Sequence, residues 1–218
     1  MTRSAARKSD EVGCVLLTAG GSRRLGRPKQ LVRYRGRPLL LNAIAAARGA
    51  LPHGPLVVVI GAQALRLRLV VRRARCRARV VMNARWEQGL ATSLRAGLAA
   101  LPATTRAALV LLVDQPLVDA PALERLLTAW RRRPGFPAAA RYEGRSGVPA
   151  VLPRGQWRAV KAMRGDEGAR ALLRRSPAIT LVDLPEAALD IDTPADAAKL
   201  ERQPARVAQL TQPAAPLA

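Results

Sequence analysis

One short segment near the amino end carries the residue types that hold phosphate groups in proteins. It follows a continuous apolar run and reads Thr18-Ala19-Gly20-Gly21-Ser22-Arg23-Arg24-Leu25-Gly26-Arg27-Pro28-Lys29. Glycines let the backbone turn so that N–H groups approach an anion, and Ser22, Arg24 and Lys29 add a hydroxyl and positive charge. It is not a P-loop, because Lys-Ser/Thr does not follow Gly26, and Ser22 replaces the second glycine of a dinucleotide fingerprint. Composition alone leaves a phosphate cradle and a flexible strand-to-helix loop equally open.

The carboxylate of Asp114 is the second group that could do chemistry. It follows the most apolar run of the chain and precedes Gln115-Pro116. In open α/β sheets, ligands bind outside the carboxyl ends of the strands, so Asp114 should lie beside the glycine loop if both strands are central. Mg²⁺ takes one or two carboxylates together with phosphate oxygens, and this pairing therefore favours Mg²⁺. A turn-initiating Asp-x-Pro without a ligand is the alternative.

Alternating apolar runs and helical periodicities surround these two segments. Buried strands are expected at 12–18, 56–60, 79–82 and 108–113. Helices are expected between and after them, at 39–48, 62–71, 90–101 and 122–132. This alternation with short connections predicts an α/β fold, a single Rossmann-like three-layer domain with a mostly parallel central sheet.

The last third of the chain is less regular. Segments 137–142 and 148–152 could pair as strands across 143–147. Further elements are expected as helices near 156–163 and 167–174, strands at 179–184 and 188–191, and a helix from Pro194. We expect one domain over 12–202, a disordered tail over 1–11 and a flexible, proline-containing tail over 203–218.

The large positive charge bears on the choice of partner. The chain has 37 Lys+Arg against 15 Asp+Glu, a formal charge of +22, with 3% aromatic residues. Only four of the cations are lysines, and an excess of arginine with alanine is what GC-rich codon usage produces. Few aromatics are available to stack on bases, so a solvated cationic surface is favoured over a nucleic-acid interface. A third interpretation is that some arginines face a small polyanionic substrate.

Localisation and redox chemistry follow from what the sequence lacks. No stretch of about 18 uncharged apolar residues is present, which excludes a transmembrane helix. No cleavable leader is recognisable, so we expect a cytoplasmic protein without a membrane partner. Cys14 and Cys76 provide neither metal-ligand spacing nor a disulfide framework.

Five segments, in one order along the chain, carry a family resemblance. They are the glycine loop, 83–98 with its Asn-Ala-Arg-Trp-Glu-Gln-Gly start, Asp114-Gln115-Pro116, 164–170 and 190–196. The loop is similar to Leu-Ala-x-Gly-x-Ser-x-Arg-Met/Leu-Gly-x-x-Lys, the signature of the MobA-like nucleotidyltransferases. Within that family the chain most resembles the molybdenum cofactor cytidylyltransferases (MocA-like), over about residues 12 to 200.

The resemblance implies a Mg²⁺-dependent nucleotidyltransferase. A phosphate on the acceptor would attack the α-phosphorus of a nucleoside triphosphate, and pyrophosphate would leave. Most specifically, it implies transfer of CMP from CTP to the molybdenum cofactor (molybdopterin). The partner that receives the product would be a molybdoenzyme or its maturation chaperone.

The resemblance also implies roles for individual residues. Nucleotide binding is implied for Leu17, Thr18, Ala19, Gly20, Gly21, Ser22, Arg24, Lys29 and Ser93. Catalytic roles are implied for Arg24, Lys29 and Asp114. The implied Mg²⁺ ligands are Asp114 and Asp192. The implied acceptor-binding residues are Gly147, Asp166 and Arg170.

The Ala19-Gly20 pair and Val148 bear on substrate choice, and Thr18 is a further departure from the family pattern. Ala19-Gly20 is similar to the cytidylyl form of the loop, whereas the guanylyl branch has Gly-Gly, and this favours CTP over GTP. Thr18 replaces the usual alanine and adds a hydroxyl. Val148 stands where the family commonly has histidine, which leaves open another phosphorylated acceptor such as a sugar or polyol phosphate.

Other functions of the protein, and purely structural roles for some of these residues, stay open. The chain could be a non-catalytic nucleotide-binding accessory factor for a molybdoenzyme; some family members have oxidoreductase roles, but no nicotinamide or flavin fingerprint is visible. Asp166 could cap a helix over 167–174, Thr193-Pro194 has the pattern of a helix start, and Ser93 could cap rather than bind an anion. Trp86 more commonly packs than stacks on a ligand.

Overall fold

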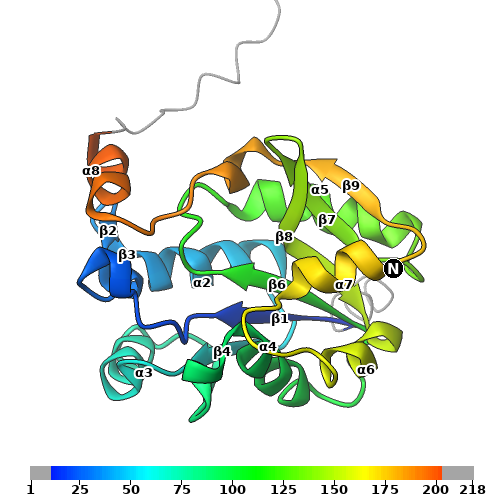
Figure 1. Ribbon diagram of the computed structural model, residues 1–218, viewed down its shortest axis with the longest axis horizontal. Coiled ribbons are helices and arrows are strands. Elements are labelled where there is room, and N and C mark those ends of the chain that lie inside the picture. Colours follow the sequence, from blue (N-terminus) through cyan, green and yellow to red (C-terminus); the bar gives the residue numbers. More distant parts are fainter. Residues whose placement is uncertain (1–10, 203–218) are drawn as a thin grey trace, which may run out of the picture.

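A seven-stranded sheet forms the middle layer of the protein. The computed structural model describes residues 11–202 of the 218-residue chain. The strands are β1 Val12–Leu17, β4 Leu56–Ile60, β5 Arg79–Met82, β6 Ala107–Leu112, β7 Ala138–Tyr142, β8 Arg145–Pro153 and β9 Thr180–Asp183. Their order is β5-β4-β1-β6-β8-β7-β9. Only β8 runs antiparallel to its neighbours, and the predicted α/β architecture with a mostly parallel sheet is confirmed (Figure 1).

The central strands are apolar throughout because both faces of the sheet are covered. Every residue of β1 and β4 is buried. Leu17 at the end of β1 pairs with Val59 of β4 and Leu112 of β6. The loops that follow these three strands therefore leave the sheet at the same edge, where the glycine loop and Asp114 were expected to meet.

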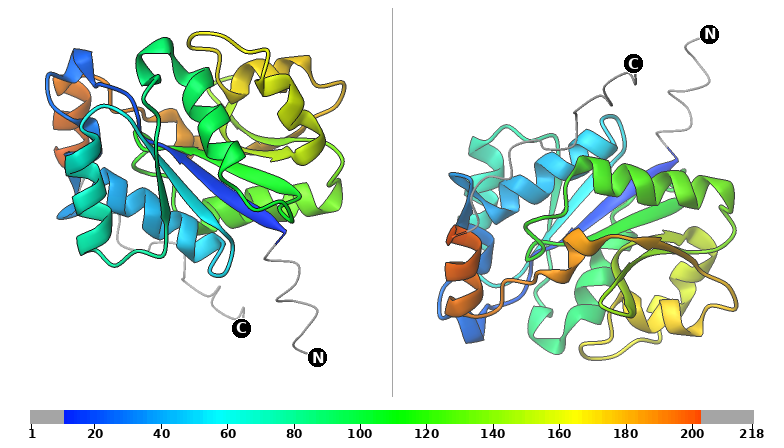
Figure 2. Two further views of the ribbon diagram at one scale, coloured as in Figure 1. Left: turned by 90° about the horizontal axis from the view of Figure 1, so that it is seen from below. Right: turned by 90° about the horizontal axis from the view of Figure 1, so that it is seen from above.

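Helices cover the two faces in separate layers (Figure 2). On one face lie α2 Leu39–Ala50, α3 Ala64–Arg73 and α5 Ala120–Arg132. On the other face lie α4 Leu90–Ala99, α6 Trp157–Val160 and α7 Ala169–Arg175. A small hairpin of β2 Arg33–Tyr34 and β3 Arg37–Pro38 contacts α8 Pro194–Arg202. The first four predicted strands and four predicted helices differ from these bounds by two residues or fewer at either end.

The hairpin of β7 and β8 confirms the expected pairing with a shorter connection. Only Glu143 and Gly144 separate the strands, with φ of 47° and 71°. Positive φ at both positions is what a two-residue type I′ turn requires, and its twist matches that of the strands. Residues 145–147, expected in the connection, belong to β8.

One expectation for the last third is wrong, and one predicted helix is much shorter than expected. Residues 188–191 form no strand; a short 3₁₀ turn, Pro185–Ala188, leads into irregular chain whose Ile191 N–H donates to the carbonyl of Asp114 at 2.9 Å. The helix expected over 156–163 is a 3₁₀ turn, Arg154–Gln156, followed by the single turn of α6.

The helix expected over 167–174 begins later, at Ala169, and its N-cap residue is Gly168. Asp166 therefore does not cap it. By contrast, the predicted helix start at Thr193-Pro194 is confirmed, because the Thr193 hydroxyl accepts from the Asp196 amide at 3.2 Å. The tails expected over 1–11 and 203–218 lie outside the described residues, except for Glu11. No helix in the described part of the chain is long and apolar enough to span a bilayer.

Candidate active site

The glycine loop is held so that its carbonyls point into the protein. The side-chain amide of Gln30 donates to the carbonyls of Thr18 at 2.6 Å and Gly20 at 2.9 Å. The carbonyl of Ala19 accepts from the Ala62 amide at 3.0 Å. Within residues 11–202, the four amides of 19–22 donate to no protein acceptor. Free amides at the edge of a sheet are the donors that an anion needs.

Thr18 and Ser22 shape this loop. The Thr18 hydroxyl is buried and donates to the Val59 carbonyl at 2.8 Å, so the group that distinguishes it from alanine ties the loop to β4. Ser22 has a left-handed backbone with φ of 52°, and its hydroxyl accepts from the Lys29 amide at 3.0 Å. Ser22 does not line the adjoining cavity, and its predicted contact with nucleotide stays a prediction.

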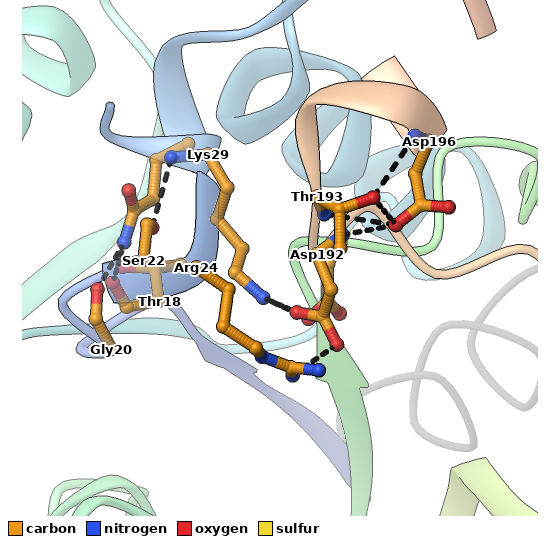
Figure 3. Close-up of polar contacts among 10 residues, drawn as sticks. Thr18, Gly20, Ser22, Arg24, Lys29, Asp192, Thr193 and Asp196 are labelled. Carbon is orange, nitrogen blue, oxygen red and sulfur yellow. Dashed lines mark hydrogen bonds and ion pairs between the residues drawn. The ribbon is translucent and has the colours of Figure 1, made fainter. Parts of the chain in front are cut away.

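Lys29 joins three segments that are distant in sequence, and Figure 3 shows its contact with Asp192. Its ammonium lies 2.7 Å from Asp114 Oδ2 and 2.6 Å from Asp192 Oδ1. Arg24 reaches the same carboxylate, with Nη2 2.6 Å from Asp192 Oδ2. The glycine loop, the end of β6 and the turn before α8 therefore meet at one point, as the sequence predicts for the first two.

The charges of this cluster stabilise one another. Burial alone would lower the pKa of Lys29, but its charge interaction and hydrogen bond with Asp114, with the bond to Asp192, raise it overall. Burial alone would raise the pKa of Asp192, yet the hydrogen bond and charge of Lys29, followed by Arg24, lower it. Lys29 is therefore charged at neutral pH.

Asp190 is a third carboxylate near this cluster, and its pKa is shifted in the opposite direction from that of Asp192. Partial removal from water, together with the neighbouring charges of Asp114 and Asp192, raises the pKa of Asp190 to about 6. Lys29 and Arg145 partly offset this shift. The site thus brings three carboxylates near two cations.

The residues present fit the Mg²⁺ that the family resemblance implies. Asp114 Oδ1 is buried and has no hydrogen-bond partner, while Oδ2 of the same group bonds Lys29. No cluster of three or more His, Cys, Asp or Glu with metal-site geometry occurs in the described residues. A cation that takes one or two carboxylates and completes its shell with phosphate oxygens and water needs no larger cluster.

Two side chains missed by sequence reasoning position this cluster. Gln115 is buried, and its amide donates to the carbonyls of Val148 at 3.1 Å and Ala187 at 2.9 Å. It thereby fixes the chain that runs to Asp192. Gln30 does the same for the glycine loop. A buried amide next to a candidate catalytic residue, as in Lys29-Gln30 and Asp114-Gln115, is the signal that could have revealed both.

A cavity of about 490 Å³ opens beside the cluster. Of the residues predicted from the sequence, it is lined by Leu17, Thr18, Ala19, Gly20, Gly21, Arg24, Lys29, Ser93, Asp114 and Asp166. Lining residues that the sequence did not single out for binding include Gln30, Trp86, Glu87 and Leu90. The predicted nucleotide-binding loop and the predicted acceptor residue Asp166 therefore share one cavity.

Ser93 and Trp86 combine packing with access to the cavity. Ser93 lies inside α4 rather than at its cap, and its hydroxyl accepts from the Asn83 side chain at 2.9 Å. The Trp86 ring lies 3.0 Å from the position where a Cβ of Gly21 would be. The indole thus rests on the glycine loop, and a larger residue at position 21 would displace one of them.

Two predicted acceptor residues lie together but outside this cavity. A Cβ on Gly147 would come 2.6 Å from the Tyr142 hydroxyl and 3.2 Å from Nη2 of Arg170. Arg170 Nη2 is 3.5 Å from that hydroxyl. A larger residue at position 147 would therefore have to displace the Tyr142 hydroxyl or the Arg170 guanidinium, and the predicted role of Gly147 towards an acceptor stays a prediction.

Comparison with known proteins identifies the family. The model of the MobA-like NTP transferase domain matches residues 14–180. The chain belongs to this family. The match confirms the family resemblance and contains four of the five segments, all but 190–196, and it makes the protein a member of a nucleotidyltransferase family.

Relatives agree with this placement. The chain is 38% identical over 192 residues to nicotine blue oxidoreductase of Paenarthrobacter nicotinovorans, covering 82% of this chain and 91% of that protein. The crystal structure of Rv0371c from Mycobacterium tuberculosis H37Rv superposes with a TM-score of 0.73 at 30% identity, covering 88% and 98% of the two chains.

A more distant neighbour shows the fold alone. Molybdopterin-guanine dinucleotide biosynthesis protein A from Archaeoglobus fulgidus has a TM-score of 0.65 at 17% identity, covering 87% of this chain and 96% of that one.

Proposed function

We propose that this protein transfers CMP from CTP to a phosphorylated acceptor, the molybdenum cofactor (molybdopterin), and releases pyrophosphate. The observation that carries the proposal is the position of Lys29 between Asp114 and Asp192, beside a loop with four free amides and in the wall of one cavity. Phosphate transfer needs hydrogen-bond donors for an anion, positioned cations and oxygen ligands for a metal ion in one place, and this cluster supplies all three.

The residues have separate tasks in this reaction. The free amides of 19–22 would bind the triphosphate, and Lys29 and Arg24 would neutralise the charge that grows on the leaving pyrophosphate. Without substrate, both cations bond carboxylates. A triphosphate offers them an alternative anion, so its entry and the release of Asp114 and Asp192 are coupled.

Asp114 and Asp192 would hold Mg²⁺. The bound ion would supply positive charge against the phosphate oxygens and orient them. A 27% identical structure, Rv0371c of M. tuberculosis, was solved in complex with manganese, which supports a divalent cation in this part of the family.

The choice of substrates rests on fewer residues. The Ala19-Gly20 pair, which resembles the cytidylyl form of the loop, supports CTP. Gly147, Asp166 and Arg170 support an acceptor on the side of β8 and α7, and Asp166 already lines the cavity. The recipient of the product would be a molybdoenzyme or its maturation chaperone.

A redox reaction is the second candidate, and one observation favours it. The 38% identical relative is named an oxidoreductase for nicotine blue. Against this, the glycine loop has Ser22 where a dinucleotide fingerprint has its second glycine, and Lys29, Asp114 and Asp192 form a cluster suited to phosphate transfer.

Pyrophosphate release distinguishes the candidates. The full chain is incubated with Mg²⁺ and each of the four nucleoside triphosphates, with and without molybdenum-loaded molybdopterin; parallel samples follow oxidation of NADH and NADPH with nicotine blue. We expect acceptor-dependent pyrophosphate release with CTP above the other triphosphates. Oxidation of a nicotinamide without pyrophosphate release would overturn the proposal, and preference for GTP would overturn the choice of CTP.

A further inference from the structure

A second cavity lies behind α4, away from the glycine loop. Its volume is about 760 Å³, against about 490 Å³ for the cavity beside Lys29, and the two share no lining residue. Its walls come from the last turns of α4 and from the segment 154–161, which contains α6. Helices α4 and α6 contact each other on the same face of the sheet (Figure 1).

The charged side chains around this cavity all have the same sign. They are Arg95, Arg154, Arg158 and Lys161, and no carboxylate lines it. Within residues 11–202, none of the four forms an ion pair. Four uncompensated cations around a concave, low-dielectric surface concentrate positive potential there, and this attracts an anion.

The floor of the cavity is apolar and contains a flat ring. Leu98, Leu101 and Val160 are each buried beneath it. The Trp157 indole is fixed in place because its N–H donates to the Leu152 carbonyl at 3.1 Å. A cavity with this floor favours a ligand with an apolar, planar body over inorganic phosphate alone.

Two of the arginines are held in place before any ligand binds. Arg95 Nη2 donates to the Met163 carbonyl at 3.0 Å, while its Nε is buried without a partner. The guanidinium of Arg154 lies 4.8 Å from the centroid of the Trp157 ring and donates to the Thr105 carbonyl at 3.0 Å. Holding a guanidinium over an indole prepares a site where an aromatic ring and an anionic group bind side by side.

We propose that this cavity binds a small aromatic anion. Its ring would lie against Trp157 and the leucines, and its carboxylate, sulfonate or phosphate would bond the arginines. The side chains of Arg158 and Lys161 are exposed and form no hydrogen bond or ion pair within the described residues, so they can close on the head group.

The cavity is connected to the first one through the chain that follows α6. Arg95 bonds the Met163 carbonyl, the Gly165 carbonyl accepts from the Ala91 amide at 3.1 Å, and Asp166 lines the cavity beside Lys29. The two sites are therefore neighbours that do not overlap, and CTP should not displace the aromatic anion.

Fluorescence titration of the full chain with anilinonaphthalene sulfonate tests the proposal. This probe has an aromatic body and one negative charge. Phenylnaphthylamine has a similar body without the charge, and inorganic sulfate has the charge without the body. We expect one saturable site for the sulfonate, with both partial probes about tenfold weaker, because each lacks one of the two contacts. Equally tight binding of either partial probe contradicts the proposal.

Matched variants locate the site. Arg158→Gln with Lys161→Gln should weaken the probe about tenfold, whereas Arg131→Gln with Arg132→Gln, which removes the same charge from exposed positions of α5, should change its affinity less than about twofold. An equal loss in both double variants would show attraction to general surface charge and overturn the proposal. So would displacement of the probe by CTP with Mg²⁺.

Naphthoate and naphthyl phosphate identify the head group. Displacement of the probe by either supports the site, and the tighter competitor tells whether a carboxylate or a phosphate is preferred. Displacement by neither contradicts an aromatic-anion site.

Discussion

Lys29 is the residue on which the candidate active site depends. It is mostly buried, it bonds Asp114 and Asp192 at once, and its backbone amide holds Ser22. Loss of its side chain would leave the two carboxylates facing each other with only Arg24 to compensate them. The same change would remove the cation nearest to the free amides of the loop.

Lys29→Ala should therefore lower the turnover of pyrophosphate release by about 10²–10³, the cost of one preorganised charge in a water-poor site. Lys199→Ala, which removes an exposed lysine on α8, is the matched control and should keep normal turnover. Steady-state kinetics with CTP and acceptor measures both. Turnover of Lys29→Ala close to that of the control would exclude Lys29 from the chemistry.

The two cysteines differ in reactivity for a physical reason. Burial raises the pKa of the Cys14 thiol on β1 to about 12, and the nearby charge of Arg48 offsets only part of this shift. At pH 8, Cys14 should stay protonated and unreactive, whereas Cys76 is partly exposed. Titration with a thiol reagent should find one reactive thiol in the native protein and two after denaturation. A native Cys76→Ser variant that still reacts rapidly would contradict the buried position of Cys14.

At the scale of elements, the turn before α8 brings in the third part of the site. The Ile191 amide bonds the Asp114 carbonyl, and the Thr193 hydroxyl bonds the Asp196 amide. In return, Asp196 Oδ2 accepts from the amides of Asp192 and Thr193 (Figure 3). This reciprocal cap starts the helix and holds the backbone of Asp192, whose carboxylate bonds Lys29 and Arg24.

Thr193→Ala should therefore reduce both stability and turnover. Loss of an N-cap costs about 1 kcal/mol of unfolding free energy, measured by urea denaturation. The hydrogen bonds from Thr193 lower the pKa of Asp196, so the contribution of the cap is present at neutral pH and is lost as the pH falls through that lowered pKa. Thr193→Ser should retain both properties. A wild-type stability in Thr193→Ala at pH 7 would contradict the role of the cap.

The sequence predicts the elements well where one local signal is sufficient. β4 and β5, each with β-branched residues in its middle, have the bounds that were predicted, 56–60 and 79–82. The strand expected at 188–191 does not form. The Ile191 amide bonds the Asp114 carbonyl and the Ile191 side chain packs in the core, so this segment pairs with no neighbouring strand. The bond from Lys29 to Asp192 joins residues 163 positions apart, and it depends on Gln115 and the cap at Thr193. Such long-range docking has no local pattern, so only the resemblance suggested Asp192.

At the scale of the whole molecule, the site links distant parts of the chain at one edge of the central sheet. The loop after β1, the end of β6 and the turn before α8 all contribute, so a ligand that bridges them opposes unfolding of the entire domain. The net charge of +22 acts separately, by attracting any anion to the surface. A binding experiment must therefore distinguish a nucleotide bound at the candidate site from an anion attracted to the surface by the net charge.

CTP with Mg²⁺ should raise the midpoint of thermal unfolding. At about 100 times its dissociation constant, a ligand of the native state adds about 2.7 kcal/mol to the unfolding free energy. In the Asp114→Asn variant, CTP with Mg²⁺ should give only a small part of this rise. In the wild type, inorganic pyrophosphate with Mg²⁺ should give part of the rise that CTP gives. The same shift with UTP as with CTP would show that the protein binds the triphosphate alone and does not read the base.

Phosphorus NMR of one reaction mixture tests the central claim most directly. The full chain, CTP, Mg²⁺ and molybdenum-loaded molybdopterin are combined, and the spectrum is followed with time. We expect the triphosphate signals of CTP to fall while pyrophosphate and a new diphosphate-linked product rise in equal amounts. Unchanged CTP signals in the presence of folded protein, or hydrolysis of CTP without a linked product, would contradict nucleotidyl transfer at this site.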